Sequence, residues 1–360
     1  MSVSTSGEAW VEVDVEALVD NARTIAKIAG TRLLPVVKAN AYGVGAALVS
    51  KALEPLDPWG YGVATIEEGA ELRNAGIARP ILVFMPARAQ RFDDYDRHQL
   101  TPALGEAGNI QEWTARGDRP FHVEIDTGMG RTGVRWDEVD ELEAAVDTPS
   151  FEGCYTHFHS AERRDGSAEK QLERFLGALE RLPRKPRLVH VANSAAALRG
   201  KQFAFDLVRP GIFLYGGSPA ADLPQARPVV SLKARVVSVR RLRRGESVSY
   251  NESWTAPHDT VIATLRCGYA DGLRRVLGTG GGGKAAVLLR GQRRPIVGFV
   301  QMDMTLVETG TLEVQVGDIA TIVGEDAKQS ITLKEFSEWS GELLHEFLTG
   351  LGPRLPRIVK

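Results

Sequence analysis

The chain reads LLPVVKANAYG from Leu33 to Gly43, a short apolar run that ends abruptly at Lys38. A run of this length, bounded by polar and glycine residues, is typical of a buried strand. The preceding residues 14–29 keep one apolar face at helical spacing, and Gly30 stands where a helix C-cap is expected. A helix followed by a buried strand is the repeating unit of an α/β protein, so this stretch predicts such a fold.

Seven further strand-like runs follow, and helical patterns lie between most of them. The runs are residues 61–64, 80–84, 100–103, 121–125, 153–157, 188–191 and 205–208. The clearest helical patterns are 66–74, 137–146 and 169–181. Strands that alternate with helices pair in parallel through right-handed crossovers, so eight such units predict a (β/α)8 TIM-type barrel. A doubly wound open sheet is the alternative, because periodicity does not reveal whether a sheet closes.

The pattern changes near residues 216–225, a stretch rich in Gly, Pro and Ala. After it, alternating runs at 229–239, 261–265, 285–289 and 319–323 are separated by turn signals. We therefore expect a barrel domain over residues 1–225 and a mainly antiparallel β domain over residues 226–360. One or two helices are expected within 333–350, and residues 1–12 are expected to pack with the C-terminal domain.

The composition is that of an ordinary folded protein and excludes several classes. The 360 residues are 43% hydrophobic, and 44 Lys and Arg balance 46 Asp and Glu, so no bulk charge favours nucleic acid or an anionic membrane. No apolar run approaches the ~18 residues of a membrane span, and the first residues show no signal-peptide pattern. Two cysteines, Cys154 and Cys267, are too few for a disulfide framework, so a cytoplasmic location is expected.

Lys38 stands at the carboxyl end of the first barrel strand, the end at which catalytic residues of this fold lie. A lysine that follows an apolar strand is costly to bury unless its charge is used or its pKa is lowered. Such a lysine suits a Schiff base. The simpler alternative is a lysine held by a salt bridge at the barrel rim.

Polar and glycine residues after the last two barrel strands suit a phosphate site. Asn193 and Ser194 follow the seventh strand, where Ser194 can cap a helix at 195–198, and Arg209, Gly211 and Ile212 follow the eighth. A plain capping serine is the alternative for Ser194 alone. In a closed barrel these strands are neighbours of the strand that carries Lys38, which favours one joint site.

Two other motifs point to different chemistry but lack the residues that would complete it. His157 and His159 form a His-x-His pair with His190 on the next strand, but no carboxylate partner set accompanies them, so we expect hydrogen-bonding roles and no metal. The glycine-rich segment 278–284 comes within one residue of a nucleotide-binding loop. Ala285 replaces its final Ser or Thr and a strand follows, so a flexible hairpin connection is expected.

Together the motifs resemble those of alanine racemase, a family of fold-type III enzymes that use pyridoxal 5′-phosphate (PLP). The matching segments are residues 37–43 (VKANAYG), 126–133 (DTGMGRTG), 155–158 (YTHF), 192–195 (ANSA), 208–211 (VRPG), 248–250 (VSY), 268–272 (GYADG) and 302–303 (MD). They cover nearly the whole chain, and the first motif is highly specific. The order, barrel before β domain, fits the racemases and not the related decarboxylases.

The resemblance implies a catalytic pair, in which Lys38 holds PLP and moves the substrate α-proton on one face while Tyr250 acts on the other. The implied cofactor-binding residues are Lys38, Tyr42, His157, Asn193, Ser194, Arg209, Gly211 and Ile212, the substrate-binding residues are Arg131, Tyr269 and Met302, and the supporting residues are Glu124 and Asp303. Arg209 would bond the pyridine nitrogen without protonating it, which disfavours transamination.

By the same resemblance, Tyr250, Tyr269 and Met302 reach the site from a second subunit, so a head-to-tail homodimer with shared active sites is expected. The implied function is that of an isomerase that interconverts L- and D-alanine and supplies D-alanine for peptidoglycan in the cell wall. A racemase of another small or basic amino acid, such as serine or lysine, is the alternative. A metal-dependent barrel hydrolase and a non-catalytic PLP protein are alternatives from other classes.

Three positions depart from the family pattern. Glu124 stands where many relatives have a carbamylated lysine, and its carboxylate is expected to be the negative partner of Arg131. Residues 298–301 read GFVQ, where an arginine commonly follows the glycine. Pro353 stands where relatives often have a phosphate-contacting tyrosine. One phosphate contact and one brace for Tyr250 are therefore expected to be missing or replaced.

Overall fold

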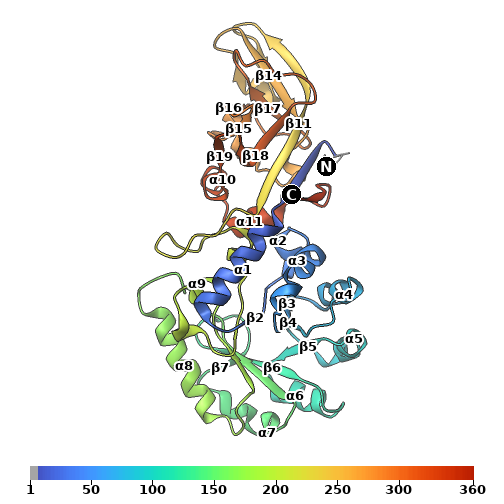
Figure 1. Ribbon diagram of the computed structural model, residues 1–360, viewed down its shortest axis with the longest axis vertical. Coiled ribbons are helices and arrows are strands. Elements are labelled where there is room, and N and C mark those ends of the chain that lie inside the picture. The colour runs from blue at the N-terminus through green and yellow to red at the C-terminus, as the bar shows by residue number, and fades with distance from the viewer. Residues whose placement is uncertain (1–6) are drawn as a thin grey trace.

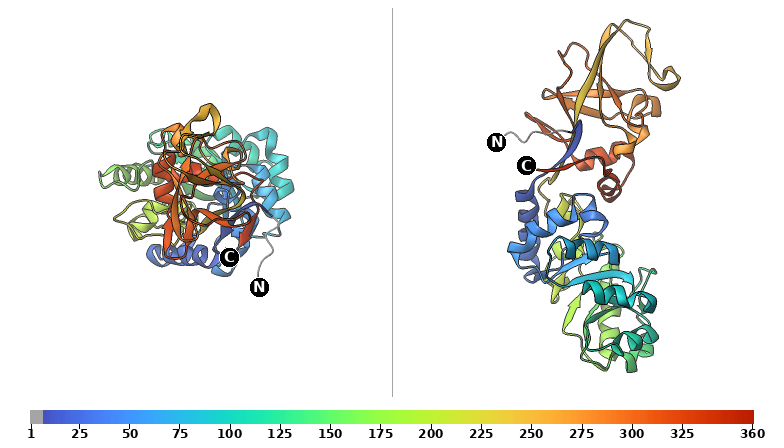
Figure 2. Two further views of the ribbon diagram at one scale, coloured as in Figure 1. Left: turned by 90° about the horizontal axis from the view of Figure 1, so that it is seen from above. Right: turned by 90° about the vertical axis from the view of Figure 1, so that its right-hand side faces the viewer.

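The computed structural model describes residues 7–360, and residues 1–6 of the segment expected to pack with the C-terminal domain lie outside them. The molecule is elongated, with a barrel of strands and helices at one end and a β domain at the other (Figures 1 and 2). No helix within residues 7–360 is long and apolar enough to cross a membrane. Both Cys154 and Cys267 are buried and free.

Eight short parallel strands form the ring of the barrel. They are β2 (Arg32–Leu33), β3 (Tyr61–Val63), β4 (Ile81–Pro86), β5 (Thr101–Leu104), β6 (Phe121–Asp126), β8 (Phe151–Tyr155), β9 (Leu188–His190) and β10 (Leu207–Val208). Strands β3 to β9 pair in chain order, with β7 (Val134–Arg135) as a short side branch on β6, and β10 pairs with β2.

The ring closes at the two junctions on either side of the β10–β2 pair. Val36, just after β2, forms a parallel bridge with Gly62 of β3. On the other side, the backbone N–H of Arg209 donates to the carbonyl of Ala192 at 2.9 Å, which joins β10 to the end of β9. The prediction of a closed barrel is therefore confirmed, and the open sheet is excluded.

Helices connect the barrel strands and cover them on the outside (Figure 1). They are α1 (Val15–Ala29), α2 (Lys38–Tyr42), α3 (Ala46–Leu53), α4 (Ile66–Asn74), α5 (Phe92–His98), α6 (Ala107–Thr114), α7 (Glu143–Val146), α8 (Ser167–Arg181) and α9 (Ser194–Leu198). Helix α1 ends as expected at Gly30, which takes a left-handed conformation with φ 69°, and it begins one residue later than expected because Asp14 is its N-cap, whose side chain accepts from Ala17 N.

The C-terminal domain contains a nine-stranded sheet, antiparallel except where β1 meets β20. Its strands are β1 (Ala9–Val13), β11 (Val230–Leu242), β14 (Thr260–Leu265), β15 (Ala286–Leu289), β16 (Gln292–Val297), β17 (Thr305–Glu308), β18 (Ile319–Asp326), β19 (Gln329–Ile331) and β20 (Arg357–Val359). A separate hairpin joins β12 (Ser247–Val248) to β13 (Trp254–Thr255). The helices α10 (Leu333–Ser340) and α11 (Leu344–Gly350) lie within the predicted range 333–350.

Strand β1 belongs to this second sheet although it begins the chain. It pairs antiparallel with β11, with Ala9 opposite Ala234, and parallel with β20, with Val11 opposite Arg357. From β1 in the C-terminal domain the chain crosses into the barrel at α1, and it returns at β11, as Figure 1 shows.

Three local expectations differ from the structure. The first strand has regular pairing only at Arg32–Leu33, because Pro35 has no N–H to donate to a ladder. The pattern at 137–146 is divided into a 3-10 turn, Val139–Leu142, and the short helix α7. The glycine-rich segment is a compact 3-10 turn, Thr279–Gly281, rather than a flexible hairpin: a Cβ on Gly283 would lie 2.1 Å from the carbonyl of Val276, so only glycine fits.

Candidate active site

The backbone after Lys38 makes a left-handed turn. Ala39, Asn40, Ala41 and Tyr42 all have φ between 51° and 54°. Each L-residue in this conformation costs roughly 1–2 kcal/mol, so the surroundings must hold the turn. The Glu68 carboxylate accepts from Ala39 N at 2.6 Å, and the Asn40 side chain accepts from Ala46 N at 2.8 Å. This turn directs Lys38 and Tyr42 into one cavity, and the sequence showed no sign of it.

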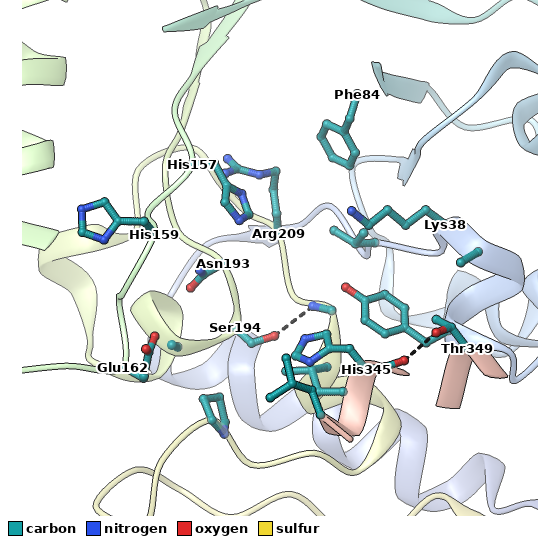
Figure 3. A pocket seen from close by; sticks show the side chains of 18 of the residues that line it. Lys38, Phe84, His157, His159, Glu162, Asn193, Ser194, Arg209, His345 and Thr349 are labelled. Carbon is teal, nitrogen blue, oxygen red and sulfur yellow. Dashed lines mark hydrogen bonds between the residues drawn. The ribbon is translucent and has the colours of Figure 1, made fainter. Parts of the chain in front are cut away.

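A cavity of about 770 Å³ lies at the carboxyl ends of the barrel strands. Ten of the residues expected at the site line it: Lys38, Tyr42, Glu124, Arg131, His157, Asn193, Ser194, Arg209, Gly211 and Ile212. Figure 3 shows the amine of Lys38 on one side of the cavity and Arg209 with His157 on the other. The ten residues come from the ends of five barrel strands, and Phe84 of β4 adds a sixth strand to the lining.

Lys38 is set in an electropositive part of the cavity. Burial lowers the pKa of its amine below the ordinary value, and the charge of Arg131 lowers it further, while Glu68 opposes the shift. A lysine with a lowered pKa is uncharged more of the time near neutral pH. It can therefore act as a nucleophile and as a proton acceptor.

Arg209 is buried and pinned by backbone carbonyls. Its Nη2 donates to Thr156 O at 2.6 Å and to Val191 O at 3.2 Å, and its Nη1 donates to the His190 ring Nδ1 at 2.8 Å. Burial lowers the pKa of the guanidinium to about 10, so it stays protonated near neutral pH. Its guanidinium also lies over the Tyr155 ring, 5.2 Å from the centroid. The arrangement holds a fixed cation that donates hydrogen bonds and does not release its proton.

Hydroxyl and amide groups meet beside α9. The Ser194 hydroxyl accepts from Gly211 N at 2.9 Å and from Phe213 N at 3.4 Å. A Cβ on Gly211 would lie 2.4 Å from the Tyr42 hydroxyl, so glycine allows Tyr42 to reach this spot. The Tyr42 ring stacks on Tyr215 with centroids 4.7 Å apart, which fixes its direction. Two hydroxyls and a glycine backbone at one point form a cradle for an anionic oxygen group.

The helix cap in this cradle differs from the expectation. Asn193, not Ser194, caps α9: its side chain accepts from Ala196 N at 3.1 Å. Because the cap is supplied by Asn193, the Ser194 hydroxyl is left to face the cradle. Helix capping, the alternative role considered for Ser194, is therefore excluded.

His157 lies near three cations. Burial lowers its pKa to about 3, and the charges of Arg209, Arg131 and Lys38 add to the shift. The ring is therefore neutral over the working range of most enzymes. It contributes a hydrogen-bonding group to the cavity without adding charge.

The charge of Arg131 acts on Glu124, as expected, but the direct hydrogen bond of Glu124 is with Thr132. Within residues 7–360, its carboxylate accepts from Thr132 Oγ1 at 2.9 Å and makes no side-chain hydrogen bond with Arg131. Burial raises the pKa of Glu124, and Thr132 and the charge of Arg131 oppose that shift. Arg131 itself is exposed.

Four predicted site residues lie on the C-terminal domain and do not line this cavity. Tyr250, Tyr269 and Met302 are exposed, with 62%, 42% and 54% of their surfaces accessible. Asp303 accepts from Arg354 Nη1 at 2.8 Å. Tyr269 and Met302 are neighbours, because Tyr269 N donates to Gln301 O and Ala270 N donates to Met302 O, both at 2.9 Å. One chain alone therefore does not bring these residues to Lys38.

Several lining residues were missed by sequence reasoning, notably Phe84, Tyr155, His345 and Thr349. Phe84 and Tyr155 stand at strand ends, so the rule that identified Lys38 also applied to them. His345 and Thr349 belong to α11 of the other domain, which no local pattern connects with the barrel. The His345 ring lies 5.8 Å from that of Tyr42. Helix α11 thus forms one wall of the cavity.

Within residues 7–360, no group of three or more His, Cys, Asp or Glu side chains could hold a metal ion. What the cavity offers is an amine, a fixed guanidinium, a neutral imidazole and an anion cradle. These groups suit a flat, phosphorylated carbonyl cofactor and a carboxylate substrate.

Comparison with known proteins agrees with this chemistry. Residues 13–219 match the family model described as the N-terminal domain of alanine racemase, and residues 229–359 match that described as its C-terminal domain. A relative from Carboxydothermus hydrogenoformans, named alanine racemase, is 37% identical over 97% of this chain and 98% of its own.

Solved structures resemble the whole chain. An alanine racemase from Bartonella henselae, described with covalently bound pyridoxal phosphate, superposes with a TM-score of 0.89 at 32% identity, covering 98% of this chain and all of that one. A histidine racemase from Leuconostoc mesenteroides subsp. sake superposes with a TM-score of 0.90 at 26% identity, covering 99% of each chain.

Proposed function

Since the chain belongs to the alanine racemase family, we propose that it binds PLP and interconverts L- and D-alanine. The observation that carries the proposal is the cavity that unites the amine of Lys38 with the guanidinium of Arg209 and the anion cradle. The lowered pKa of Lys38 supports the same conclusion, because a Schiff base forms from the uncharged amine.

The residues present fit the cofactor. Gly211 leaves the space that a Cβ would fill, and Tyr42 and Ser194 direct hydroxyls toward it, so these three would hold the phosphate. Arg209 would donate to the pyridine nitrogen and Lys38 would hold the aldehyde carbon. When bound, PLP supplies an electron sink that makes the substrate α-proton acidic.

Two groups of the protein would move that proton. Lys38 would take or return it on one face, since its amine has a lowered pKa and lies inside the cavity. Inversion requires a second acid/base on the opposite face, and we assign this role to Tyr250. Arg131 would bind the substrate carboxylate, with His157 as a neutral hydrogen-bonding neighbour of Arg209.

The second base implies a second subunit. Tyr250, Tyr269 and Met302 are exposed on the C-terminal domain and lie outside the cavity of their own chain. We propose a head-to-tail homodimer in which these residues complete the partner's cavity and Asp303, with Arg354, supports the segment that carries Met302. Exposed aromatic and methionine side chains of this kind are enriched in protein interfaces.

We also propose the substrate and the cellular role of the enzyme. Alanine is favoured by the matched relatives, and the histidine racemase neighbour favours another amino acid as the second candidate. Serine or lysine were the alternatives from the sequence. The proposed role is the supply of D-alanine for peptidoglycan in the cytoplasm.

The decisive experiment uses the purified protein. We expect a visible absorption band from bound cofactor, and loss of solvent deuterium exchange at the α-carbon of both alanine enantiomers in Lys38→Ala. Lys51→Ala is the matched control, because Lys51 is an exposed lysine of α3. A band that persists in Lys38→Ala would show that another lysine carries PLP. Faster exchange with histidine, serine or lysine than with alanine would overturn the substrate assignment.

A further inference from the structure

A chain of buried polar side chains runs from Arg209 into the barrel, away from the cavity. Arg209 Nη1 lies 2.8 Å from His190 Nδ1, His190 Nε2 lies 2.9 Å from His122 Nδ1, and His122 Nε2 lies 3.5 Å from Glu152 Oε2. Both imidazole rings are completely buried. Three successive strands, β6, β8 and β9, supply the three residues below Arg209.

The guanidinium determines the direction of the two hydrogen bonds in this chain, and the third link, from His122 Nε2 to Glu152, is a charge contact at 3.5 Å without a hydrogen bond. A guanidinium only donates, so His190 Nδ1 must accept and its proton must lie on Nε2. His190 Nε2 then donates to His122 Nδ1, which leaves the His122 proton on Nε2, facing the Glu152 carboxylate. An ionised carboxylate only accepts. Two neutral rings therefore connect a cation to an anion.

Glu152 ends the chain at the opposite end of the barrel. It is the second residue of β8, and its side chain is 14% exposed and pairs with Arg187 at 2.6 Å. It lines a separate cavity of about 400 Å³ with Asp118, Ser150 and Arg187. The chain thus connects the cofactor end of the barrel with its far surface.

The protonation states agree with this direction. Burial lowers the pKa of both His122 and His190, so both rings are neutral. Burial alone would raise the pKa of Glu152, but its interactions with His122 and Arg187 outweigh burial and hold the pKa below the usual value. The nearby charged groups at the upper end are Arg131 and Glu124 beside Arg209.

Packing leaves the two rings no other position. A Cβ on Gly153 would lie 2.4 Å from His122 Nδ1 and Cε1, so the ring occupies the space of the missing side chain. The His190 ring stacks on Tyr155 with centroids 5.0 Å apart and planes at 11°. Trp59 covers His122 from the other side, with ring centroids 5.4 Å apart. Because the rings cannot reorient, a change in charge at Glu152 alters the hydrogen bond at Arg209.

We propose that His190, His122 and Glu152 are positioning residues for the racemase reaction, which hold and polarise Arg209 from the far end of the barrel. The inference rests on the proposed function. The negative charge of Glu152 polarises the two imidazole rings, so that His190 Nδ1 becomes a stronger hydrogen-bond acceptor for Arg209. The same charge stabilises the protonated guanidinium, which therefore does not release its proton to a cofactor nitrogen.

A double-mutant cycle tests the proposal on the PLP-loaded protein. Glu152→Gln is expected to lower kcat about tenfold with little change in KM, the effect of weakening one charge-assisted bond. His190→Asn keeps an acceptor for Arg209 but cuts the link to His122, so Glu152→Gln should change kcat less than about twofold in that background. Asp118→Asn is the matched control: it lies in the same far cavity and accepts from Ser150 at 2.7 Å, and it should leave kcat unchanged.

A second measurement needs neither cofactor nor mutation. In ¹⁵N-histidine NMR of the PLP-free protein, His122 and His190 should both show the Nε2–H tautomer and remain neutral from about pH 6 to about pH 9. Titration of either ring in that range, or an Nδ1–H tautomer, would overturn the proposal. The proposal would also be overturned if Glu152→Gln changed kcat by the same factor in the unaltered protein and in His190→Asn. These outcomes differ from failure of the proposed function, which would appear as absence of racemisation in the unaltered protein.

Discussion

The residues after Lys38 show how local strain can serve a site. Four consecutive non-glycine residues, 39–42, have positive φ, a conformation that favours glycine and is stabilised here by Glu68 and the Asn40 side chain. The result is that Lys38 and Tyr42, four positions apart, both face the cavity. For single residues, the position of the site side chains depends on unusual backbone conformations and on short distances between neighbouring atoms.

Gly211 allows one such approach. In Gly211→Ala the new Cβ would lie 2.4 Å from the Tyr42 hydroxyl, so we expect the cradle to be displaced and the dissociation constant of PLP to rise by about tenfold or more. Spectroscopic titration of the PLP-free protein measures it. Gly177→Ala in α8 is the control, because a Cβ there meets nothing within 4 Å, and unchanged affinity is expected. Equal affinities of the two variants would contradict the assignment of the cradle.

His157 gives a prediction on acid stability. The folded protein holds its pKa at about 3, chiefly by burial, whereas an unfolded histidine titrates near pH 6.5. The unfolded state therefore binds a proton that the folded state does not, and the free energy of unfolding falls as pH drops from about 6.5 to about 3. In His157→Gln this fall should be smaller by up to about 1.4 kcal/mol per pH unit. Urea unfolding over a pH series measures the slope.

The control for this measurement is His258→Gln, since His258 is an exposed histidine on the C-terminal domain. Its slope should match that of the unaltered protein. If the His157 variant loses stability with acid as steeply as the control, His157 is not the neutral group described above.

At the level of elements, helix α11 and the turn α2 join the two domains. Gly43 ends α2 with φ 78°, and its carbonyl accepts from Arg357 Nε of β20 at 2.8 Å. A Cβ on Gly43 would lie only 2.1 Å from the carbonyl of Leu348 in α11. Because the two elements touch backbone to backbone, the C-terminal domain supports the turn that carries the lysine.

Gly43→Ala should therefore disturb more than one element. We expect a loss of about 1–3 kcal/mol in the free energy of unfolding beyond that of Gly341→Ala, measured by urea unfolding. Gly341 is a close match because its φ is 70° and a Cβ there meets nothing within 4 Å, so the backbone strain is common to both variants. Equal destabilisation of the two variants would mean that the α2–α11 contact does not contribute to the free energy of unfolding.

At the scale of the whole molecule, the arrangement of the two domains separates the proposed acid/base groups. Lys38 lies in the barrel cavity, and Tyr250 is 62% exposed on the β domain and absent from that cavity's lining. Strand β1, which precedes the barrel in the chain, pairs with β20 in the β domain. The proposed head-to-tail dimer would bring the two groups together, because each chain would complete the site of the other.

Subunit mixing tests this arrangement. Lys38→Ala and Tyr250→Phe should each be nearly inactive alone, but a refolded equimolar mixture should regain about a quarter of the unaltered activity. Half of the dimers are hybrids, and one of the two sites in each hybrid then carries both native residues. Absence of recovery, with dimers present by sedimentation, would mean that each chain forms its own complete site.

Much of this protein was accessible from its sequence because the signals are local. Alternating apolar runs and helical periods identified the eight barrel strands, α1 with its C-cap, and the antiparallel strands that follow residue 229. Lys38 and the residues after the seventh and eighth strands were identified because strand ends in a barrel share one face.

The tertiary structure alone decided the rest, because these features depend on partners distant in the chain. Ring closure rests on pairs such as Val36 with Gly62, and the left-handed turn at 39–42 is held by Glu68 and by contact with α11, about 300 residues away in sequence. The chain from Arg209 to Glu152 exists only because three strands place buried side chains end to end. Local propensity does not encode such contacts; the packed core determines them.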